Sequence, residues 1–384
     1  MGTTFERILH AALYTISPEG SWGLPLLLWG KPGSGKTAAI KAAASRSGLY
    51  CERISPAERG EGQFGVIGVP SKDRKFLDYP APRFVEAFAN GGLLFLDEIN
   101  TAPPALQAPL LGAVQLRAIG ASYLGDRTRV IGAANEARDG TGTWTLGMSL
   151  RNRFGHLDYS GLDPVAWVSG FLGGFGDSEG RVDACDEEAR VTRAWPGAIA
   201  MSRGLVAGYV GAMGASALDA PPAAGSPQKS WPSRRTVEYA AHALAASSVH
   251  GLTEDESDEF LAAFVGAAWV SQFRTWVLAA DMPDAIEFLD GRVQWSHSPL
   301  RVDRTAALLA ACAAIVIPEG SERRLERGRV LWETIGEICK TTPDCAVSTA
   351  RMLCKNGLDH RTVKGAHVAL ERLEAVLRET GAVS

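Results

Sequence analysis

The sequence predicts an α/β domain built on a parallel sheet over residues 1–160, followed by an all-α region over residues 161–384. In the first part, short apolar runs alternate with helical patterns, and a glycine-rich loop joins the first run to a helix. Continuous apolar runs separated by helices are typical of a parallel sheet with helices on both faces. In the second part, apolar residues recur every three to four positions in segments rich in Ala and Leu, which indicates helices.

The first part begins with "MGTTFERILHAALYTI" (1–16), whose apolar residues share one helical face and predict an amphipathic helix. A second helix is expected from "AAIKAAASRS", directly after the glycine-rich loop. Five apolar runs have the length of strands: "LPLLLW" (24–29), "LYCERI" (49–54), "GLLFLD" (92–97), "RVIGAA" (129–134) and "FGHLDY" (154–159).

The second part is predicted to contain a helical lid and a helical C-terminal region. The stretch "ASALDAPPAAGSPQKSWP" (215–232) has four prolines and is expected to be a loop. The segments with helical spacing are 233–248, 259–280, 302–317, 329–340 and 363–381.

Composition excludes several classes of protein. The net charge of −4 and an isoelectric point near 6.0 argue against a general binder of polyanions. The six cysteines are scattered without metal-ligand spacing, which is typical of reduced thiols inside a cell, and no apolar run is long enough for a bilayer. We therefore expect a cytoplasmic protein without a membrane partner.

Histidines in helical or polar stretches are expected to be ordinary surface or core residues: His10, His242, His250, His297, His360 and His367.

The motif "GKPGSGKT" at 30–37 fits the phosphate-binding pattern G-x-x-x-x-G-K-[ST], and it lies between an apolar run and a helix, as that pattern requires. Its glycines allow backbone N–H groups to turn toward phosphate oxygens, and the helix N-terminus adds its dipole. The sequence thus predicts ATP as ligand, with Lys36 on the β- and γ-phosphates and the Thr37 hydroxyl on Mg²⁺. The residues expected to bind nucleotide in this loop are Gly30, Lys31, Pro32, Gly33, Ser34, Gly35, Lys36 and Thr37.

Two further strand ends carry polar groups. The run "GGLLFLDEIN" ends in Asp97 and Glu98, and adjacent carboxylates at the end of a buried strand are costly unless a cation or a reacting water uses them. We expect Asp97 to hold Mg²⁺ together with Thr37, and Glu98 to polarise the attacking water. Asn135 ends the run "RVIGAAN" and is expected to orient the same water, although an amide that only caps the next loop is the rival interpretation.

With these motifs the sequence resembles an AAA+ ATPase, and within that superfamily the MoxR group. The resemblance rests on "GKPGSGKT", "LLFLDEINTAPPALQAPLLGAV", "VIGAANEA" and "SLRNRF", although Thr101 replaces the usual arginine of the second motif. Residues 62–88 stand where that group inserts a hairpin. The stretch "SWPSRRTVEYA" is similar to the segment with the sensor-2 arginine, which falls on Arg235.

The resemblance also gives a role to two arginines in "SLRNRF". In AAA+ rings, the arginine before the fifth strand reaches the γ-phosphate bound by the neighbouring subunit. Arg153 is the candidate for this arginine finger and Arg151 is the second choice, whereas an ion pair to an acid such as Asp158 is the structural alternative. If the finger is correct, the site is completed only by a second chain, which implies a closed ring. AAA+ kinship suggests a hexamer.

These expectations combine into a Mg²⁺-dependent, ring-forming ATPase that remodels or activates a partner protein. The resemblance to MoxR proteins implies a protein client with a von Willebrand A domain. One alternative is a nucleic-acid-dependent motor subunit of a McrB-like restriction or defence system, although the acidic isoelectric point counts against nucleic acid. Another is a scaffold that binds ATP without turnover, against which Glu98 argues.

Overall fold

The computed structural model describes residues 3–56, 68–78, 82–120, 122–136, 144–173, 182–223, 229–280, 282–317, 323–359, 362–363 and 366–379. The chain forms two compact units. The first comprises Met1–Trp195 and Pro221–Ala268, and the second comprises Pro196–Ala220 and Trp269–Ser384. The units therefore do not divide at residue 160, because part of the helical region belongs to the same unit as the sheet.

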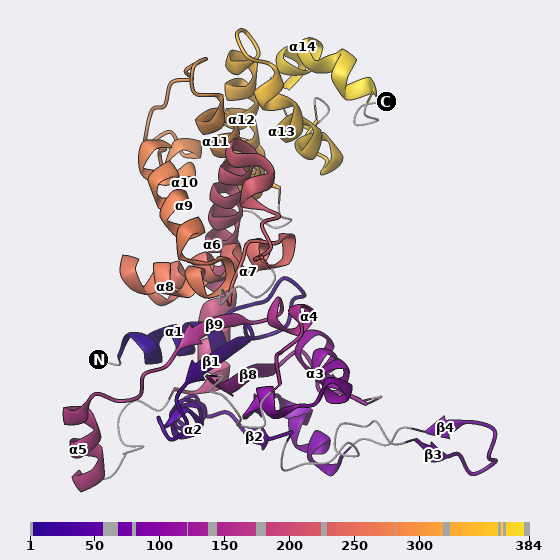
Figure 1. Cartoon of the computed structure of the whole chain (residues 1–384). Helices are drawn as coiled ribbons and strands as arrows, with labels where there is room; N and C mark the ends of the chain where they lie inside the picture. Colours follow the sequence, from indigo (N-terminus) through magenta and orange to yellow (C-terminus); the bar gives the residue numbers. More distant parts are fainter. Residues whose placement is uncertain are drawn as a thin grey trace. The chain divides into compact units, whose positions relative to one another are not determined.

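The first unit contains the predicted parallel sheet. Its five strands have the order β2-β5-β8-β1-β9, and every neighbouring pair is parallel (Figure 1). Each predicted apolar run forms one of them, which confirms the α/β class. Their bounds are β1 Leu26–Gly30, β2 Cys51–Ile54, β5 Gly92–Leu96, β8 Thr128–Asn135 and β9 Gly155–Asp158.

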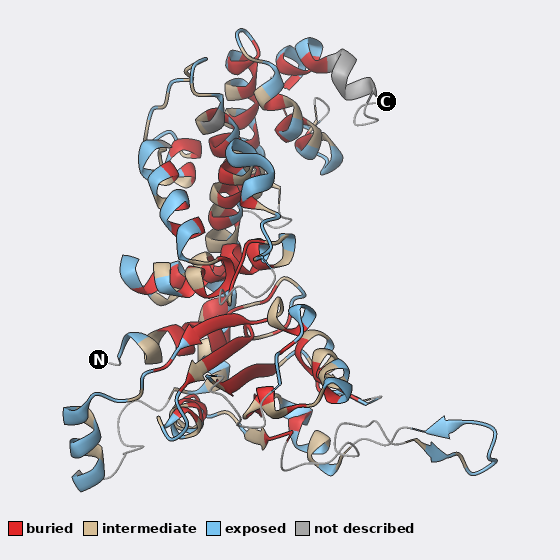
Figure 2. Cartoon of the chain, in the orientation of Figure 1, coloured by how far each residue is buried: buried red, intermediate tan, exposed pale blue. Residues whose placement is uncertain are grey.

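The strands β1, β5 and β8 are largely apolar and buried, as expected for a parallel sheet covered on both faces (Figure 2), whereas the edge strand β2 is mostly half-buried. All of β5 is buried, and only the last residue of β8 reaches intermediate exposure. In the register of the sheet, Gly30 at the end of β1 lies opposite Asn135 at the end of β8. The loop after β1 therefore begins beside the predicted polar strand end.

The helices of the first unit include the predicted amphipathic helix at the N-terminus. Thr3 and Glu6 form a capping box at its start, which satisfies two backbone N–H groups. The helices of this unit are α1 (Thr4–Leu13), α2 (Lys36–Arg46), α3 (Pro104–Leu116), α4 (Met148–Arg151), α5 (Pro164–Gly173), α7 (Arg234–His250) and α8 (Glu254–Val265), with the 3₁₀ turns η2 (Arg83–Asn90) and η3 (Ile99–Thr101).

The segment expected to carry an inserted hairpin lies partly outside the described residues, at 62–67 and 79–81. Its described part contains an antiparallel pair, β3 (Val69–Pro70) with β4 (Leu77–Asp78). A second short antiparallel pair joins β6 (Ala118–Ile119) to β7 (Ser122–Tyr123). Both hairpins stand apart from the five-stranded sheet.

The second unit is helical, as predicted. The long helix α6 (Ala184–Met213) is shared between the units, whose boundary falls at Pro196 within it. The predicted stretch 259–280 is two helices rather than one, because Gly266 adopts a positive φ of 87° and ends α8. The remaining elements are η4 (Gly214–Ala217), α9 (Ala267–Ala280), α10 (Ala285–Leu289), α11 (Val302–Val316), α12 (Arg324–Ile338), α13 (Asp344–Lys355) and α14 (Ala366–Glu379).

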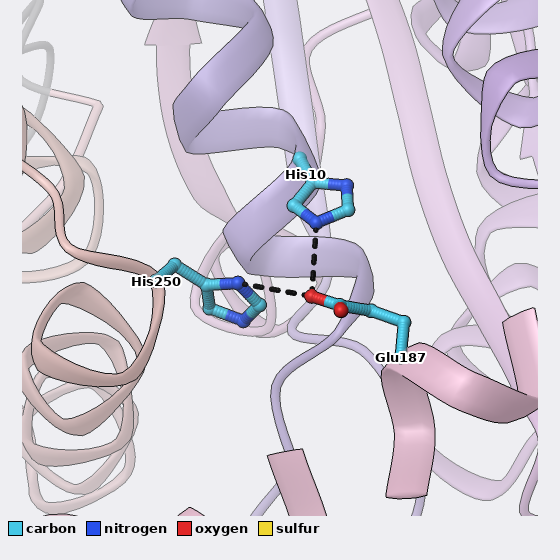
Figure 3. Close-up of side chains that lie close together, drawn as sticks. All are labelled: His10, Glu187 and His250. Atoms are coloured by element: carbon cyan, nitrogen blue, oxygen red, sulfur yellow. Dashed lines mark hydrogen bonds and ion pairs between the residues drawn. The ribbon is translucent and has the colours of Figure 1, made fainter. Parts of the chain in front are cut away.

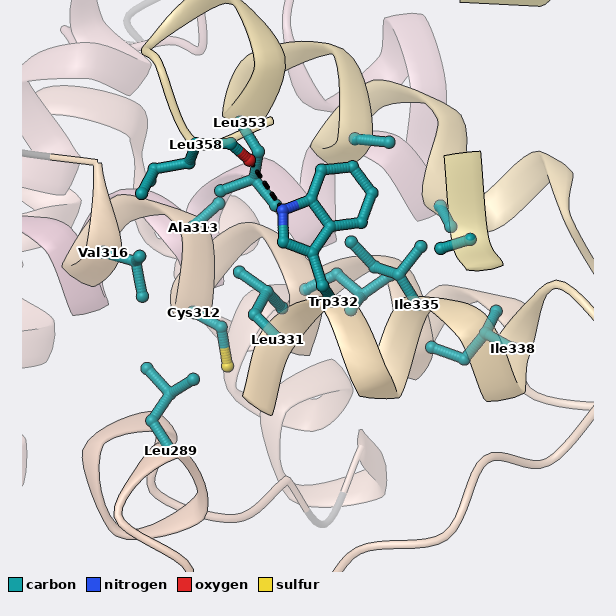
Figure 4. Packing of buried hydrophobic residues seen from close by; sticks show 14 of the residues in the cluster. Leu289, Cys312, Ala313, Val316, Leu331, Trp332, Ile335, Ile338, Leu353 and Leu358 are labelled. Atoms are coloured by element: carbon teal, nitrogen blue, oxygen red, sulfur yellow. Dashed lines mark hydrogen bonds between the residues drawn. The ribbon is translucent and has the colours of Figure 1, made fainter. Parts of the chain in front are cut away.

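The core of the second unit is centred on Trp332 of α12, which is 1% exposed (Figure 4). Its indole Nε1 donates a hydrogen bond of 2.7 Å to the carbonyl oxygen of Leu358, so the one polar atom of the ring is satisfied. On α6, a Cβ at Gly208 would collide with Ala307 of α11. Glycine at this position therefore allows the two helices to approach closely.

No helix among the residues that the structure describes is both long enough and apolar enough to cross a bilayer.

Candidate nucleotide-binding site

The predicted phosphate loop lies between β1 and α2, as its pattern requires. Gly33 and Gly35 have positive φ angles of 76° and 92°, which side chains disfavour, and Gly35 caps α2. A Cβ on Gly30 would collide with the carbonyl oxygen of Tyr159, so glycine is also needed where the loop begins. The loop lines a pocket of about 410 Å³, formed by Trp29, Gly30, Lys31, Pro32, Gly33, Ser34, Glu136, Asp158, Tyr159 and Ser160.

Lys36 of α2 is buried and is held by three oxygen atoms. Its Nζ donates to the carbonyl oxygens of Gly30 (2.8 Å) and Lys31 (3.0 Å) and to the side-chain Oδ1 of Asn135 (3.0 Å). Burial lowers the pKa of Lys36, and the carboxylates of Asp97 and Glu98 oppose that shift. The structure thus brings together the loop lysine and the predicted polar strand end.

Asn135 is itself held in place by a second asparagine. Asn100 Nδ2 donates to the backbone carbonyl of Asn135 (2.8 Å), and the backbone N–H of Asn135 donates to Asn100 Oδ1 (3.2 Å). Because Oδ1 of Asn135 accepts from Lys36, its NH₂ group is the part of the amide that can donate to a ligand.

Asp97 and Thr37, the two predicted metal ligands, are in direct contact. The Thr37 hydroxyl donates to Asp97 Oδ2 at 2.9 Å, and Asp97 is 3% exposed. The same oxygen accepts from Arg53 Nε at 2.6 Å. Arg53 lies on β2, which pairs with β5 just before Asp97. Sequence reasoning missed this arginine, because the pairing of two strands brings it to the site.

Glu98 adopts a left-handed backbone conformation, with φ 51° and ψ 41°. Such a conformation costs free energy for a residue with a side chain and is often found at functional sites. Its backbone carbonyl accepts from the hydroxyl of Thr101 at 2.8 Å, so the residue that replaces the usual arginine of the motif supports this turn.

The residues present fit a bound triphosphate and its Mg²⁺. The Oγ of Ser34 is buried without a hydrogen-bond partner among the described residues, and a phosphate oxygen would satisfy it. Lys36 and the first N–H groups of α2 add positive charge at the same place. Thr37 and Asp97 would hold the cation, since hydroxyl and carboxylate oxygens are the ligands that Mg²⁺ prefers.

The two candidate finger arginines lie at the end of α4 and directly after it. Arg153 Nε donates to Gln115 Oε1 of α3 (2.8 Å), and its Nη1 donates to the carbonyl of Ser149 (2.5 Å). The Arg151 guanidinium packs over the ring of Trp231, 5.5 Å from the ring centre. Asp158, the acid considered as an alternative partner, forms its ion pair with Lys229.

Arg235 lies in the first turn of α7 and is half-buried. Its positive charge contributes to lowering the pKa of Arg153, after the larger effect of burial. The candidate sensor-2 residue is therefore close enough to the candidate finger for their charges to interact. Next to them, Ser233 at the N-cap of α7 donates to Asn152 Oδ1 (3.0 Å), which ties α7 to the end of α4.

Three other residues at the site were given no role by the sequence. Tyr159 and Glu136 line the pocket, and the side chain of Asn100 in the 3₁₀ turn η3 forms hydrogen bonds with the backbone of Asn135. His156 of β9 is buried and accepts from the indole of Trp29 (2.9 Å). A side-chain contact between two strands cannot be read from spacing along the chain.

The parallel sheet of order β2-β5-β8-β1-β9, with the phosphate loop after β1 and the acidic pair after β5, defines a P-loop NTPase of the AAA type. Residues 26–157 match the family model described as "ATPase family associated with various cellular activities (AAA)". The match covers the sheet and the phosphate loop, and it agrees with the resemblance at the superfamily level.

Two curated relatives match this chain over about a third of their own length. The chain is 34% identical over 106 residues to the "Pathogenicity locus probable regulatory protein HrpS" of Pseudomonas syringae pv. syringae. This match covers 25% of this chain and 33% of that protein. The protein of the same name from Pseudomonas savastanoi pv. phaseolicola is 33% identical over 106 residues, with the same coverage. The chain thus spans about a third of the length of these relatives.

Among solved structures, the chain is similar to one described as a "putative ATPase" from Cytophaga hutchinsonii. The two share 17% identity with a TM-score of 0.42, over 67% of this chain and 79% of that one.

Proposed function

We propose that this protein hydrolyses ATP with Mg²⁺ and that it does so in a ring of identical subunits. The observation that carries the proposal is the convergence of Lys36, Thr37, Asp97 and Asn135 at one edge of the sheet. A structural role alone does not explain why a lysine, a hydroxyl, a carboxylate and an amide from three elements meet beside a glycine-rich pocket.

The chain supplies a role for each group. Lys36 and the N–H groups at the start of α2 bind phosphate oxygens and neutralise their charge. Thr37 and Asp97 position Mg²⁺, which when bound neutralises charge on the β- and γ-phosphates. Glu98 accepts a proton from the attacking water, and the NH₂ group of Asn135 holds that water in line.

A positive charge from a second chain would complete the site. Among the described residues that line the phosphate-loop pocket, none is an arginine. Arg153 and Arg235 instead lie near one another, with Arg153 bonded to Gln115 of α3. This arrangement supports a head-to-tail ring in which Arg153 serves the pocket of the neighbouring subunit. We infer a hexamer of the MoxR-like type from the motifs that carry that resemblance.

The work done with ATP is proposed to be the remodelling or activation of a partner protein. Kinship with the MoxR group suggests a client with a von Willebrand A domain. A scaffold that binds ATP without hydrolysing it would not require the strained backbone conformation of Glu98.

The test is ATP turnover and ATP affinity in three variants. Lys36→Ala is expected to lose ATP binding. Glu98→Gln is expected to retain ATP binding and to lower turnover by about 10²-fold or more, the share of a general base. Glu136→Gln is the matched control, because it removes a second carboxylate at the same pocket and should have a smaller effect. Wild-type turnover in Glu98→Gln would reject this base, and a wild-type protein without Mg²⁺-dependent turnover would reject the function.

One observation favours a second function, a nucleic-acid-dependent motor of the McrB-like type. The β3–β4 hairpin exposes the cations Lys72, Arg74 and Lys75 together with the aromatic ring of Phe76. Cations beside an aromatic ring suit the backbone and bases of single-stranded nucleic acid. Stimulation of ATP turnover by DNA or RNA, lost in a variant with these three cations changed to Ser, would favour the motor over the protein remodeller.

A further inference from the structure

Three side chains far apart in the sequence meet in the first unit, away from the phosphate loop. His10 comes from α1, Glu187 from the first turns of α6, and His250 from the last turn of α7 (Figure 3). Two histidines and a carboxylate are the ligand set that zinc and other borderline divalent metals prefer.

The distances suit a single ion. Glu187 Oε1 lies 3.2 Å from His10 Nε2 and 3.5 Å from His250 Nδ1, and all three ligand atoms lie within 4.8 Å of one another. Ligand atoms of a tetrahedral zinc site, each about 2.0–2.2 Å from the metal, are separated by roughly 3.3–3.6 Å. The distances from Glu187 Oε1 to the two imidazole nitrogens therefore need little adjustment, and a fourth position remains for water.

The surroundings of His250 fix its ring in a form that can bind a metal. Its Nε2 lies 3.4 Å from the carbonyl oxygen of Tyr14. Because a carbonyl oxygen only accepts, Nε2 carries the proton, and the unprotonated Nδ1 accepts from Arg190 Nη2 (3.1 Å) beside Glu187. A backbone carbonyl behind a ligating histidine is the arrangement that orients such ligands in metal sites.

The protonation states agree with this assignment. Burial lowers the pKa of His10, and burial together with the charges of His10 and Arg190 lowers that of His250 to about 4. The hydrogen bond from Arg190 lowers the pKa of Glu187 to about 2. Burial thus favours the neutral form of both imidazoles and Arg190 favours the ionised carboxylate, which are the forms that bind metals.

A guanidinium lies beside the ligand atoms. Arg190 Nη2 is 2.6 Å from Glu187 Oε1 and 3.1 Å from His250 Nδ1, and Arg190 Nε is 2.9 Å from Glu187 Oε2. Its side chain is 43% exposed, whereas those of His250 and Glu187 are 4% and 12% exposed. Arg190 Nη1 also donates to the carbonyl oxygen of Val249 (3.0 Å), so a metal at this place requires Arg190 to give up its bonds to Glu187 and His250 and to turn toward solvent.

We propose that His10, Glu187 and His250 form a zinc-binding site that joins α1, α6 and α7, and that Arg190 balances the carboxylate when the metal is not bound. Binding moves the proton of the neutral His10 ring from Nε2, which donates to Glu187 in the metal-free form, to Nδ1. His10 is 33% exposed and gives the ion its path from solvent. The proposal does not depend on ATP hydrolysis.

The test is titration of the chelator-treated full chain with Zn²⁺, without nucleotide, followed by calorimetry and thermal unfolding. A Cys185→Ser background removes the exposed thiol that could bind Zn²⁺ by itself. We expect one Zn²⁺ per chain and a higher unfolding temperature. Glu187→Gln and His250→Asn are each expected to weaken binding more than about tenfold, whereas His297→Asn, in the second unit, should not change it.

A second variant keeps the proposal testable if the ligand variants fail to fold. Arg190→Ala removes the competing cation and leaves all three ligands, so it should tighten Zn²⁺ binding by about tenfold. Co²⁺ in place of Zn²⁺ should give the intense visible absorption of a tetrahedral site. Absence of stoichiometric binding, or equal affinity in wild type, Glu187→Gln and Arg190→Ala, would overturn the site.

Discussion

The side-chain Nε of Arg53 lies 2.6 Å from Asp97 Oδ2, the same oxygen that accepts the hydroxyl of Thr37. Arg53 thereby places a fixed positive charge on the carboxylate proposed to hold Mg²⁺. A guanidinium and a divalent cation compete for one carboxylate, since each is stabilised by the same negative charge. Arg53 should therefore set how much Mg²⁺ the protein needs.

Replacing Arg53 by Gln is expected to lower the Mg²⁺ concentration at half-maximal ATP turnover, because no guanidinium then competes with the metal for the Asp97 carboxylate. Arg53→Lys retains the charge and should change this concentration less. Mg²⁺ titrations of the steady-state rate at saturating ATP measure both variants. A higher Mg²⁺ requirement in Arg53→Gln would mean that Arg53 orients Asp97 rather than competing for it.

Arg153→Ala is expected to lower ATP turnover by about 10³-fold or more and to spare ATP affinity, because a guanidinium on the transferred phosphate acts in the transition state. The variants Arg153→Ala and Lys36→Ala are each expected to be inactive alone and to regain activity when they are mixed. In a ring assembled at random from equal amounts of both, roughly a quarter of the interfaces join an intact pocket to an intact arginine. To measure this, the rings of each variant are dissociated, the two variants are mixed and allowed to reassemble, and ATP turnover is measured as a function of protein concentration.

Arg151→Ala is the matched comparison for the finger. Its guanidinium packs over Trp231, so its loss should reduce stability more than turnover. Two results would contradict the assignment of Arg153. One is a larger loss of turnover in Arg151→Ala, and the other is an inactive mixture of Arg153→Ala with Lys36→Ala.

The features that could be predicted from the sequence are those that follow from short stretches of the chain, namely the strands and the phosphate loop. Strands β1, β5 and β8 are largely apolar runs, and the phosphate loop between β1 and α2 has a fixed spacing, so both could be predicted without a structure. Thr37 and Asp97, predicted as partners, are in contact. The break at Gly266 was missed because the apolar pattern continues through it.

Contacts set by the pairing of distant segments could not be predicted. Arg53 reaches Asp97 only because β2 pairs with β5 in a register that places Arg53 opposite Phe95. His10 and His250 each looked ordinary in the sequence, and folding brings both to Glu187. Neither relation has a signal in spacing along the chain, because each depends on how helices and strands pack.

The buried histidines are expected to make the protein less stable in mild acid. His250 and His156 each have a pKa of about 4, chiefly through burial, against 6.5 for a free imidazole. Between these values the unfolded chain binds more protons, so the free energy of unfolding falls as pH drops from about 6.5 to about 4. One such group contributes a slope of up to about 1.4 kcal/mol per pH unit.

His250→Asn should flatten this pH dependence and leave the part due to His156. Denaturant unfolding at several pH values, with chelator present so that bound metal does not vary, measures the slope. A slope unchanged by His250→Asn would show that His250 is protonated in the folded protein.

Trp332→Ala is expected to destabilise the second unit by about 3–5 kcal/mol, because it leaves a cavity at the centre of the core and an unsatisfied carbonyl at Leu358. Trp332→Phe keeps most of the volume and loses the hydrogen bond of the indole, so it should cost less. Trp295→Phe is the matched control, since Trp295 is only partly buried at the edge of the same cluster. Hydrogen exchange of amides in α11 and α12 reports on this unit separately from the first unit. Equal protection in Trp332→Ala and Trp295→Phe would mean that the core of the second unit does not depend on Trp332.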